Sequence, residues 1–402
     1  MRNALLGSLG LVTVIGYVQR LALSAPTKDI ERDLHIGPAE MGVVMGAWYW
    51  GYALFQLPSG WVADRVGSKT ALVLFSVAWS ACTALAGRAT RFEELAVLWA
   101  LMGCAQAGLF PCATKAVGAA FPADRQAFAS GILACSMAMG AAVAQRLTPQ
   151  LLGTFTWQQI LVVYAVPGLV WAVLFALFIP RPDPPAPPSA SRPRLKWSKL
   201  FTDPQMQLLC LQQFLRAAAI AFFYTWFPRY LQETKGVSVR EAGGFAAWPP
   251  FAGMFGGLLG GLFSDWVLRK TGSSRLARQG MACAAMVVCA ATSFAAFFVT
   301  DIRAAVGLLC VGAFCGMAGG VSGYAVAIAY GGKQVATVFA TVNMWGNVGA
   351  ASFPLVVGWL VASTGNWNLA LFLFGGLFAL DAVCWAVLNP KGTLFEEEPC
   401  GA

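Results

Sequence analysis

The sequence predicts an all-α integral membrane protein with twelve transmembrane helices in two six-helix bundles. Hydrophobic residues make up 58% of its 402 positions and charged residues only 11%, whereas soluble domains carry about 25% charged residues. Nearly every apolar block has the length of roughly 17 to 25 residues that crosses a bilayer as a helix. A short charged hinge occurs twice, about half a chain apart, and this repetition indicates two similar halves.

The expected spans lack the alternating hydrophobic pattern of transmembrane barrel strands. The first span begins directly after the N-terminal residues, so no cleavable signal peptide is expected. The spans lie at about Asn3–Pro26, Glu40–Ala63, Thr70–Gly87, Glu93–Phe121, Gln126–Leu147, Trp157–Ile179, Gln205–Leu231, Glu241–Asp265, Ala277–Val299, Arg303–Tyr330, Lys333–Ala362 and Trp367–Leu388.

A proline-rich basic segment divides the chain. Residues 1–179 are expected to form the N-terminal six-helix bundle and residues 205–390 the C-terminal one. Residues 180–204 between them are expected to be an extended cytoplasmic linker, because prolines and charges keep such a segment from packing. Residues 391–402 form the expected cytoplasmic tail.

The basic residues that give the net charge of +9 indicate how the chain is oriented in the membrane. Most loop lysines and arginines, including those of the linker, fall on the side of the N-terminus. This excess marks the cytoplasmic face, so both termini are expected in the cytoplasm, with the chain passing many times through the cytoplasmic membrane. The bilayer is the expected surrounding of the protein, no nucleic-acid partner is expected, and a monomer is expected to be the functional form.

Catalytic and metal-binding patterns are missing from the sequence. The eleven cysteines are scattered without a CxxC pair or a His/Cys cluster, so neither a disulfide framework nor a metal site is expected. With one histidine, and no grouping of acid, base and nucleophile within the spans, the chain is not expected to be an enzyme. No cofactor is expected.

The two hinges separate hydrophobic helices by short charged turns. Glycines there allow a tight turn, and charged residues fix where the membrane ends. The first hinge carries Gly60, Asp64, Arg65, Gly67 and Lys69, and the second carries Asp265 and Arg269.

Polar residues inside the first two spans are the main candidates for binding a solute. Arg20, with Tyr17 on the same helix face, lies well inside the first span. An arginine there costs about 2.5 to 3.5 kcal/mol, so it is expected to face a wet cavity, with snorkelling or a structural pair as the alternative. Tyr49, Tyr52 and Gln56 form a polar stripe on the second span, either as a binding wall or as an interhelical contact.

Further polar residues occur deep in other spans, and each also has a structural interpretation. They are Gln106 in the fourth span, Arg216 and Tyr224 in the seventh, Asn343 and Asn347 in the eleventh, and Asp381 in the twelfth. For Asp381, a structural or snorkelled role is favoured. Pro111 is expected to loosen the fourth span by removing one backbone hydrogen bond.

Several motifs together resemble the major facilitator superfamily. They are the hinge GWVADRVGSK, the segments GYVQR, IGPAEMGVVMGAWYWGYALFQLPSGWVADRVG, GLFP and FPADRQAFASG, and the late segment VNMWGNVGAASFPLVVG. The resemblance covers nearly the whole chain and is strongest in its first half; the combined motifs are specific to the superfamily and fairly specific to its anion:cation symporter branch. That branch includes bacterial galactonate, glucarate and hexuronate importers and animal sialic acid and vesicular glutamate carriers.

The resemblance implies the major facilitator fold and transport of a small organic anion, such as a sugar acid or another carboxylate, by alternating access. It implies that Arg20 binds the substrate carboxylate and that polar side chains of three helices line the cavity. It further implies a cytoplasmic gate at which Asp64 lies near Arg125. The implied cavity residues besides Arg20 are Tyr52, Gln56, Asn343 and Asn347.

Two residues depart from the branch. Gln19 and Gln106, which are both expected to bind the substrate, stand where its symporters typically carry an aspartate and a glutamate. Because an amide does not titrate, the usual proton-carrying pair is missing. The chain is therefore expected to be a facilitator or an exchanger, or to take its coupling ion elsewhere. A polyspecific exporter of apolar compounds and a non-transporting sensor with a carrier fold are the alternative functions.

Overall fold

The computed structural model describes residues 2–121, 123–179, 197–331, 335–390 and 392–394. Within these residues all regular elements are helices. In chain order they are α1 (Arg2–Arg20), α2 (Thr27–Leu34), α3 (Pro38–Val66), α4 (Ser68–Ala86), α5 (Phe92–Gln106), α6 (Leu109–Ala120), α7 (Ala123–Leu151), α8 (Trp157–Phe178), α9 (Trp197–Thr202), α10 (Pro204–Tyr224), α11 (Phe227–Lys235), α12 (Val239–Ala246), α13 (Trp248–Thr271), η1 (Leu276–Gly280), α14 (Met281–Phe298), α15 (Ile302–Gly331), α16 (Val335–Thr364) and α17 (Asn368–Val387).

The long helices agree with the expected spans. Nine helical stretches among the described residues are long and apolar enough to cross a membrane. Three further helices, α1, α3 and α7, have 19, 29 and 29 residues and stand at the positions of the first, second and fifth expected spans. The all-α membrane class expected from the sequence is confirmed.

The chain separates into two compact units. The first comprises the described residues of Met1–Pro187, Phe222–Phe251 and Ala351–Leu369, and the second comprises the rest. The expected bundle limits of 1–179 and 205–390 stay a prediction, because α10, α13 and α16 each contribute residues to both units. The proline-rich part of the linker and most of the tail lie outside the described residues.

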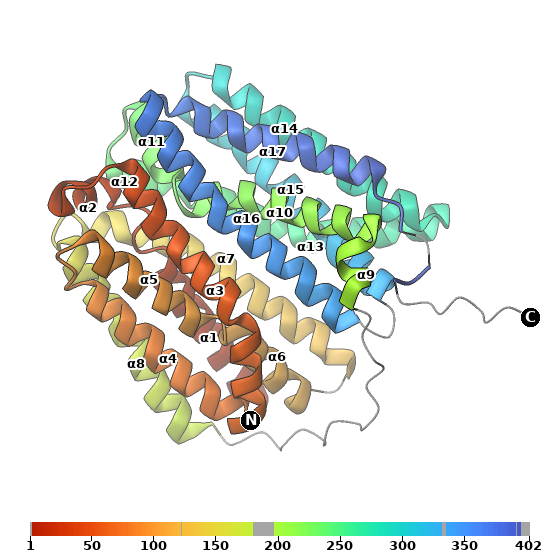
Figure 1. Cartoon of the computed structure of the whole chain (residues 1–402), viewed down its shortest axis with the longest axis horizontal. Coiled ribbons are helices and arrows are strands. Elements are labelled where there is room, and N and C mark those ends of the chain that lie inside the picture. The colour runs from red at the N-terminus through yellow and green to blue at the C-terminus, as the bar shows by residue number, and fades with distance from the viewer. Residues whose placement is uncertain (1, 122, 180–196, 332–334, 391, 395–402) are drawn as a thin grey trace, which may run out of the picture. The chain divides into compact units, whose positions relative to one another are not determined.

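Close backbone contacts organise the first unit. In this unit α3 packs on α5, α4 packs on both α5 and α8, and α1 packs on α7 and α8 (Figure 1). A Cβ atom on Gly51 would lie 2.1 Å from the carbonyl oxygen of Ala100, and one on Gly103 would lie 2.1 Å from that of Trp48. Small residues thus let α3 and α5 approach until their backbones touch.

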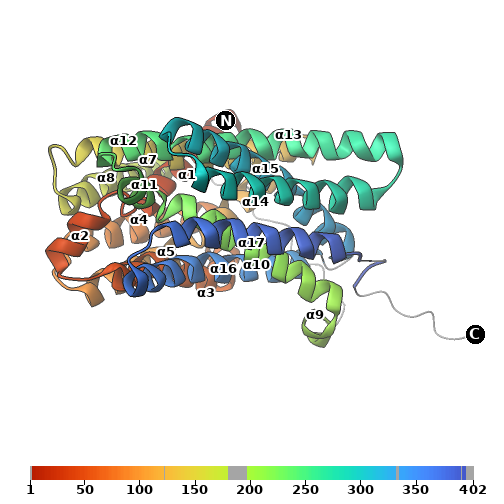
Figure 2. The same ribbon diagram turned by 90° about the horizontal axis from the view of Figure 1, so that it is seen from above.

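The second unit is packed in the same manner. Helix α14 lies along α15 (Figure 2). A Cβ atom on Gly256 of α13 would lie 2.0 Å from the carbonyl oxygen of Phe314 in α15. The glycine-rich surfaces therefore serve helix packing, as expected in a membrane protein, where small residues permit close van der Waals contact.

The fourth span, which Pro111 was expected only to loosen, is divided into two helices. Helix α5 ends at Gln106 and α6 begins at Leu109, because Pro111 has no N–H to donate to the carbonyl of Ala107. Gly108 lies at the break, where a Cβ atom would come within 2.2 Å of the Phe75 ring.

One other span ends earlier than expected, and two are divided. Helix α1 stops at Arg20, whereas the sequence suggested a helix reaching about Pro26. The seventh span is divided between α10 and α11, and Pro228 stands at the start of α11. The eighth is divided between α12 and α13, with Pro249 at the start of α13. Proline fits the first turn of a helix, where its missing N–H needs no partner. Within the expected linker 180–204, α9 is a short helix that follows the proline-rich segment.

Both expected hinges are present. Helix α3 ends at Val66, and Gly67 has φ of 84° before α4 begins. Helix α13 ends at Thr271, and Gly272 has φ of 65° before the chain turns toward η1. Positive φ favours glycine, which has no Cβ atom to clash. The two halves of the sequence thus use the same turn chemistry.

Candidate functional site

Arg20 is surrounded by four aromatic rings. It is the last residue of α1, and its positive charge lies at the C-terminal end of the helix dipole, where a cation is favoured. Its Cζ atom lies 3.8 Å from the ring centre of Trp48 and 4.7 Å from that of Tyr49. The rings of Tyr17 and Tyr224 follow at 5.1 and 6.0 Å. Cation–π attraction acts over such distances, so rings from α1, α3 and α10 hold the guanidinium.

The rings hold the Arg20 cation without neutralising it. Among the described residues, none of the ion pairs includes Arg20, and its buried Nε atom has no hydrogen-bond partner. A cation that is partly removed from water and has no counter-ion attracts an anion strongly. The planar guanidinium also matches the oxygens of an acidic group in a forked geometry.

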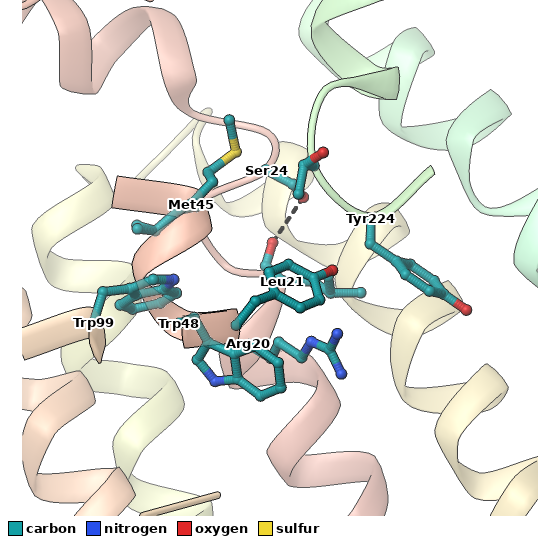
Figure 3. A pocket seen from close by; sticks show the side chains of 10 residues that line it. Arg20, Leu21, Ser24, Met45, Trp48, Trp99 and Tyr224 are labelled. Carbon is teal, nitrogen blue, oxygen red and sulfur yellow. Dashed lines mark hydrogen bonds between the residues drawn. The ribbon is translucent and has the colours of Figure 1, made fainter. Parts of the chain in front are cut away.

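A cavity adjoins the guanidinium (Figure 3). Arg20 and three of its four rings line it, and Tyr17 does not; the other lining residues are Leu21, Leu23, Ser24, Met45, Trp99 and Thr225. Its volume of about 20 Å³ has room for about one water molecule. Ligand pockets usually reach on the order of 300 Å³ or more, so an organic acid would enter only after the lining side chains separate.

The tyrosines of the site are positioned by α7. Tyr17 packs on Ala141 and Ala144 of that helix. The Nε2 atom of Gln145, which is fully buried, donates to the carbonyl oxygen of Phe223 at 3.1 Å and so holds the end of α10 that carries Tyr224. Sequence reasoning missed Gln145, since its distant partner is a backbone atom.

Trp48 is a further site residue that sequence reasoning missed. Its ring is the closest to Arg20 and stacks on Tyr52 with ring centres 4.9 Å apart. Its Nε1 donates to Oε1 of Gln106 at 3.1 Å, and Nε2 of Gln106 donates to the carbonyl oxygen of Gly16 at 3.0 Å. Gln106 therefore braces the site by joining α1, α3 and α5. The four-residue spacing of Trp48 and Tyr52 was a signal that could have found this tryptophan.

Gln19 points away from the Arg20 cavity. Its side chain is fully buried, and Nε2 donates to the carbonyl oxygen of Tyr164 at 2.7 Å and to Oγ of Ser80 at 3.4 Å. Adjacent residues of a helix project about 100° apart, so Gln19 turns toward α4 and α8 while Arg20 turns toward the aromatic rings. The structure thus places this expected substrate-binding residue outside the cavity.

Of the expected polar stripe on α3, only one residue lines the cavity. Tyr49 lines it, whereas Tyr52 and Gln56 lie further along the helix and are half-buried. Ser24 lines the cavity from the turn after α1, where its Oγ donates to the carbonyl oxygen of Leu21 at 2.7 Å. Ser24 is not on the helix face that Tyr17 and Arg20 share, because the helix ends at Arg20.

Three expected binding residues belong to the second unit. Arg216 is buried, and its Nη2 donates to Oε1 of Gln213 at 2.8 Å. Asn343 and Asn347 lie one turn apart on α16, with Nδ2 of Asn347 donating to the carbonyl oxygen of Asn343 at 3.1 Å. Their proximity to each other is as expected, and their contact with a substrate stays a prediction.

The first hinge is described only in part. Lys69 donates from Nζ to the carbonyl oxygen of Ala176 at 2.8 Å, which ties α4 to the end of α8. Gly60 has open space where a side chain would begin, and Arg65 is exposed. The side chains of Asp64 and Arg125 lie outside the described residues, and so does the gate expected between them.

The second hinge forms an ion pair across the turn. Nη2 of Arg278 lies 2.9 Å from Oδ1 of Asp265, and its Nη1 donates to Oγ of Ser264 at 2.9 Å. These contacts tie α13 to η1. Arg269, also expected at this hinge, is exposed.

A charged cluster of Lys28, Glu31, Arg229 and Glu233 joins α2 to α11, outside the helices that could span a membrane. Arg229 lies 3.3 Å from Glu31 and 2.7 Å from Glu233, which also pairs with Lys28 at 3.0 Å. The Arg229 guanidinium lies 5.5 Å from the ring centre of Trp367. This cluster closes one end of the first unit, and sequence reasoning missed it because its members are far apart in the chain.

The two carboxylates of this cluster are expected to differ in their contribution to stability. Burial raises the pKa of Glu31, and the charge of Arg229 offsets this only in part. Burial would also raise the pKa of Glu233, but the hydrogen bond from Lys28 and the charge of Arg229 outweigh it and lower the pKa. The folded state therefore favours the charged form of Glu233 and disfavours that of Glu31.

Glu233→Gln is therefore expected to destabilise the protein at neutral pH by about 2 kcal/mol, and Glu31→Gln by much less. The stability that ionised Glu233 contributes is fully present above the ordinary pKa of glutamate in the unfolded chain. It is lost as pH falls through the lowered pKa of Glu233 in the folded protein. For Glu31 the sign is opposite, and the folded state gains stability as pH falls through the raised pKa. Thermal unfolding midpoints of the two purified variants, measured from neutral to acidic pH, check both signs. Equal losses at neutral pH would contradict this ranking.

A family model described as the Major Facilitator Superfamily matches residues 8–321. The chain belongs to this superfamily. The match covers both hinges and the Arg20 site, and it confirms the resemblance seen in the motifs. As a member of the Major Facilitator Superfamily, the protein is a multi-pass membrane transporter, and the expectation that it is not an enzyme is confirmed by this membership.

Relatives of this superfamily member are transporters of organic acids by name. It is 28% identical over 415 residues to the "Probable sulfoacetate transporter SauU" of Cupriavidus necator, covering 98% of this chain and 95% of that protein. It is 30% identical over 406 residues to the "Probable galactarate/D-glucarate transporter GudP" of Bacillus subtilis, covering 93% and 89%. It is 27% identical over 379 residues to the "D-galactonate transporter" of Escherichia coli, covering 88% of each chain.

Solved structures confirm the major facilitator fold. Two crystal structures of a bacterial homologue of the human lysosomal transporter Spinster, both inward-facing, align with TM-scores of 0.77 and 0.75. They are 18% and 19% identical to this chain and cover 96% of it, with 95% and 94% of their own chains covered. Likeness at this identity concerns the fold alone.

Proposed function

We propose that this protein carries a small organic anion, such as a sugar acid or another carboxylate, across the cytoplasmic membrane by alternating access. Arg20 is the main contact of the anion's acidic group. The observation that carries the proposal is the Arg20 guanidinium, held by four aromatic rings beside a cavity without an ion-pair partner among the described residues. A buried cation is costly unless an opposite charge joins it, and a bound anion supplies that charge.

The relatives support the substrate class. Sulfoacetate, galactarate, glucarate and galactonate, the solutes in their names, are all small organic acids that are negatively charged at neutral pH. An arginine fork recognises an acidic group whatever the rest of the molecule is. The specific acid is then selected by neighbouring side chains, for which Tyr49 and Tyr224 at the cavity are the candidates.

The two glutamines support a carrier without the usual proton pair. Gln19 and Gln106 hold backbone carbonyl oxygens through their Nε2 atoms, so both amides act as structural braces. Neither amide titrates. We therefore propose that any coupling ion binds elsewhere. Both termini lie in the cytoplasm in this proposal, in agreement with the excess of basic loop residues on that side.

Ligand binding is expected to raise the thermal unfolding midpoint of the purified protein. Candidate probes are D-glucarate, D-galactonate, D-glucuronate and sulfoacetate, since a ligand that binds only the folded state stabilises it in proportion to saturation. Arg20→Ala is expected to abolish the shift. The control Arg303→Ala, which removes an exposed arginine at the start of α15, is expected to keep it. A shift that is equal in wild type and Arg20→Ala would overturn the assignment of Arg20.

The polyspecific exporter remains the second candidate because of the aromatic lining of the cavity. Such an exporter would recognise apolar solutes by stacking and would not need the cation. Efflux of an apolar dye by Arg20→Ala at the wild-type rate would favour it. The organic anion is the first choice, because the rings here are engaged with Arg20 itself.

A further inference from the structure

Asp381 is a fully buried carboxylate in the second unit. It lies about two turns before the end of α17, its side chain is 0% exposed, and neither carboxylate oxygen has a hydrogen-bond partner among the described residues. The snorkelled role considered for it is therefore wrong, because snorkelling requires contact with water. A carboxylate in this position must either hold a proton or take a cationic partner.

Arg216 of α10 supplies the positive charge that acts on Asp381. It is 5% exposed, its Nη2 donates to Gln213, and its buried Nε atom has no partner. The two groups are not among the ion pairs shorter than 4 Å formed by the described residues. A permanent structural pair would satisfy both partners directly, whereas here each keeps an unpartnered atom.

Residues of three helices surround Arg216 and Asp381. Gln212 and Arg216 lie one turn apart on α10, and Asp381 and Trp385 lie one turn apart on α17. Glycines of α15 face both pairs. A Cβ atom on Gly320 would lie 2.6 Å from Nη1 of Arg216, and one on Gly323 would lie 3.4 Å from Gln212 and 3.7 Å from Trp385.

The polar atoms of this region are unusually unsatisfied. Oε1 of Gln212 and Nε1 of Trp385, like Nε of Arg216 and both carboxylate oxygens of Asp381, are buried without a partner among the described residues. Three titratable groups interact electrostatically with Asp381. They are Arg216, Cys289 of α14 and Cys384 of α17 itself. Buried polar atoms without partners are costly, so a group of them around a buried carboxylate and a buried guanidinium requires an explanation beyond helix packing.

We infer that Asp381 is the proton-binding group of the transport cycle and that Arg216 is its charge partner. A proton from water forms an O–H bond with one carboxylate oxygen, which leaves the Arg216 charge available to an anion. Release of that proton to water leaves a carboxylate that attracts Arg216. This inference rests on the proposed anion transport and supplies the coupling group that Gln19 and Gln106 do not.

Proteoliposomes separate coupling from transport. Counterflow exchanges labelled for unlabelled solute and needs no driving ion, whereas accumulation driven by a pH gradient requires a proton site. The probe is whichever of D-glucarate, D-galactonate and sulfoacetate exchanges fastest. Wild type is expected to show both activities, and Asp381→Asn to keep counterflow and lose accumulation. The control Glu93→Gln removes an exposed carboxylate and is expected to keep both.

Each outcome bears on a different claim. Accumulation that persists in Asp381→Asn, or that is absent in wild type while counterflow proceeds, would overturn the proton-binding role and leave the proposed function standing. Absence of counterflow in wild type would overturn the proposed function and the coupling role with it.

A second measurement needs no substrate and no transport. Infrared difference spectra of the full-length protein between acidic and alkaline pH are expected to show a buried protonated carboxyl band. Asp381→Glu, which keeps a titratable group, is expected to shift this band, and Asp381→Asn to remove it. A wild-type spectrum without a titrating carboxyl band would overturn the inference even if Asp381→Asn does not fold.

Discussion

Counterflow of organic acids is expected to fall about 100-fold or more in Arg20→Ala. Truncating one partner of a desolvated charge pair costs about 2 to 5 kcal/mol, and each 1.4 kcal/mol corresponds to about tenfold in affinity. Alanine removes the charge and the forked donors together, and it leaves the rings of Trp48 and Tyr49 without the cation they hold. Initial counterflow rates in proteoliposomes, measured over a range of substrate concentrations, check this effect.

Arg20→Lys distinguishes charge from geometry. Lysine keeps the positive charge but lacks the planar fork and stacks less well on aromatic faces. Counterflow is therefore expected to fall by about tenfold, between wild type and alanine. The exposed Arg303→Ala is the control for loss of one arginine. Wild-type counterflow in Arg20→Ala would exclude Arg20 as the anion contact.

Gly103→Ala is expected to destabilise the protein strongly and to disturb the Arg20 site. The added Cβ atom would lie 2.1 Å from the carbonyl oxygen of Trp48, a backbone atom that cannot rotate aside. Helices α3 and α5 must then separate, at a cost of about 3 kcal/mol. Separation would also stretch the hydrogen bond from Trp48 to Gln106, which lies one turn after Gly103.

The thermal unfolding midpoint and the ligand-induced shift are the two measurements for this variant, and both are expected to decrease. Gly7→Ala is the matched control, because a Cβ atom on Gly7 of α1 would meet nothing within 4 Å. Its midpoint is expected to stay at or slightly above the wild-type value, since alanine favours a helix over glycine. Equal midpoints for the two variants would show that α3 and α5 are not in backbone contact.

Much of the fold was predictable because membrane burial leaves a strong mark on sequence. Long apolar blocks gave the helices, and the two glycine hinges were correctly placed at Gly67 and Gly272. The loosening of the fourth span at Pro111 was expected, although its division into two helices was not. Helix ends elsewhere were less accurate, as at Arg20 and Tyr224, because a hydrophobic run does not specify where the backbone stops being helical.

The site was predictable only in part. The helical spacing of Tyr17 and Arg20 and the polar stripe of α3 identified Arg20 and two of the rings around it, those of Tyr17 and Tyr49. Sequence reasoning did not select Trp48, whose ring is closest to the cation, although Trp48 lies four residues before Tyr52, and it did not select Gln145, which holds the end of α10. Both depend on partners in helices that are distant in sequence.

By itself, the sequence determined that this chain is a helical membrane protein with a charged arginine that needs a polar surrounding, because hydrocarbon excludes charge at any position. Only the tertiary structure decided what that surrounding is. It enclosed Arg20 in aromatic rings, turned Gln19 toward α4 and α8, and buried Asp381 among unpartnered polar atoms. The physical reason is that hydrophobicity acts residue by residue, whereas the partner of a polar group is fixed by which helices pack together.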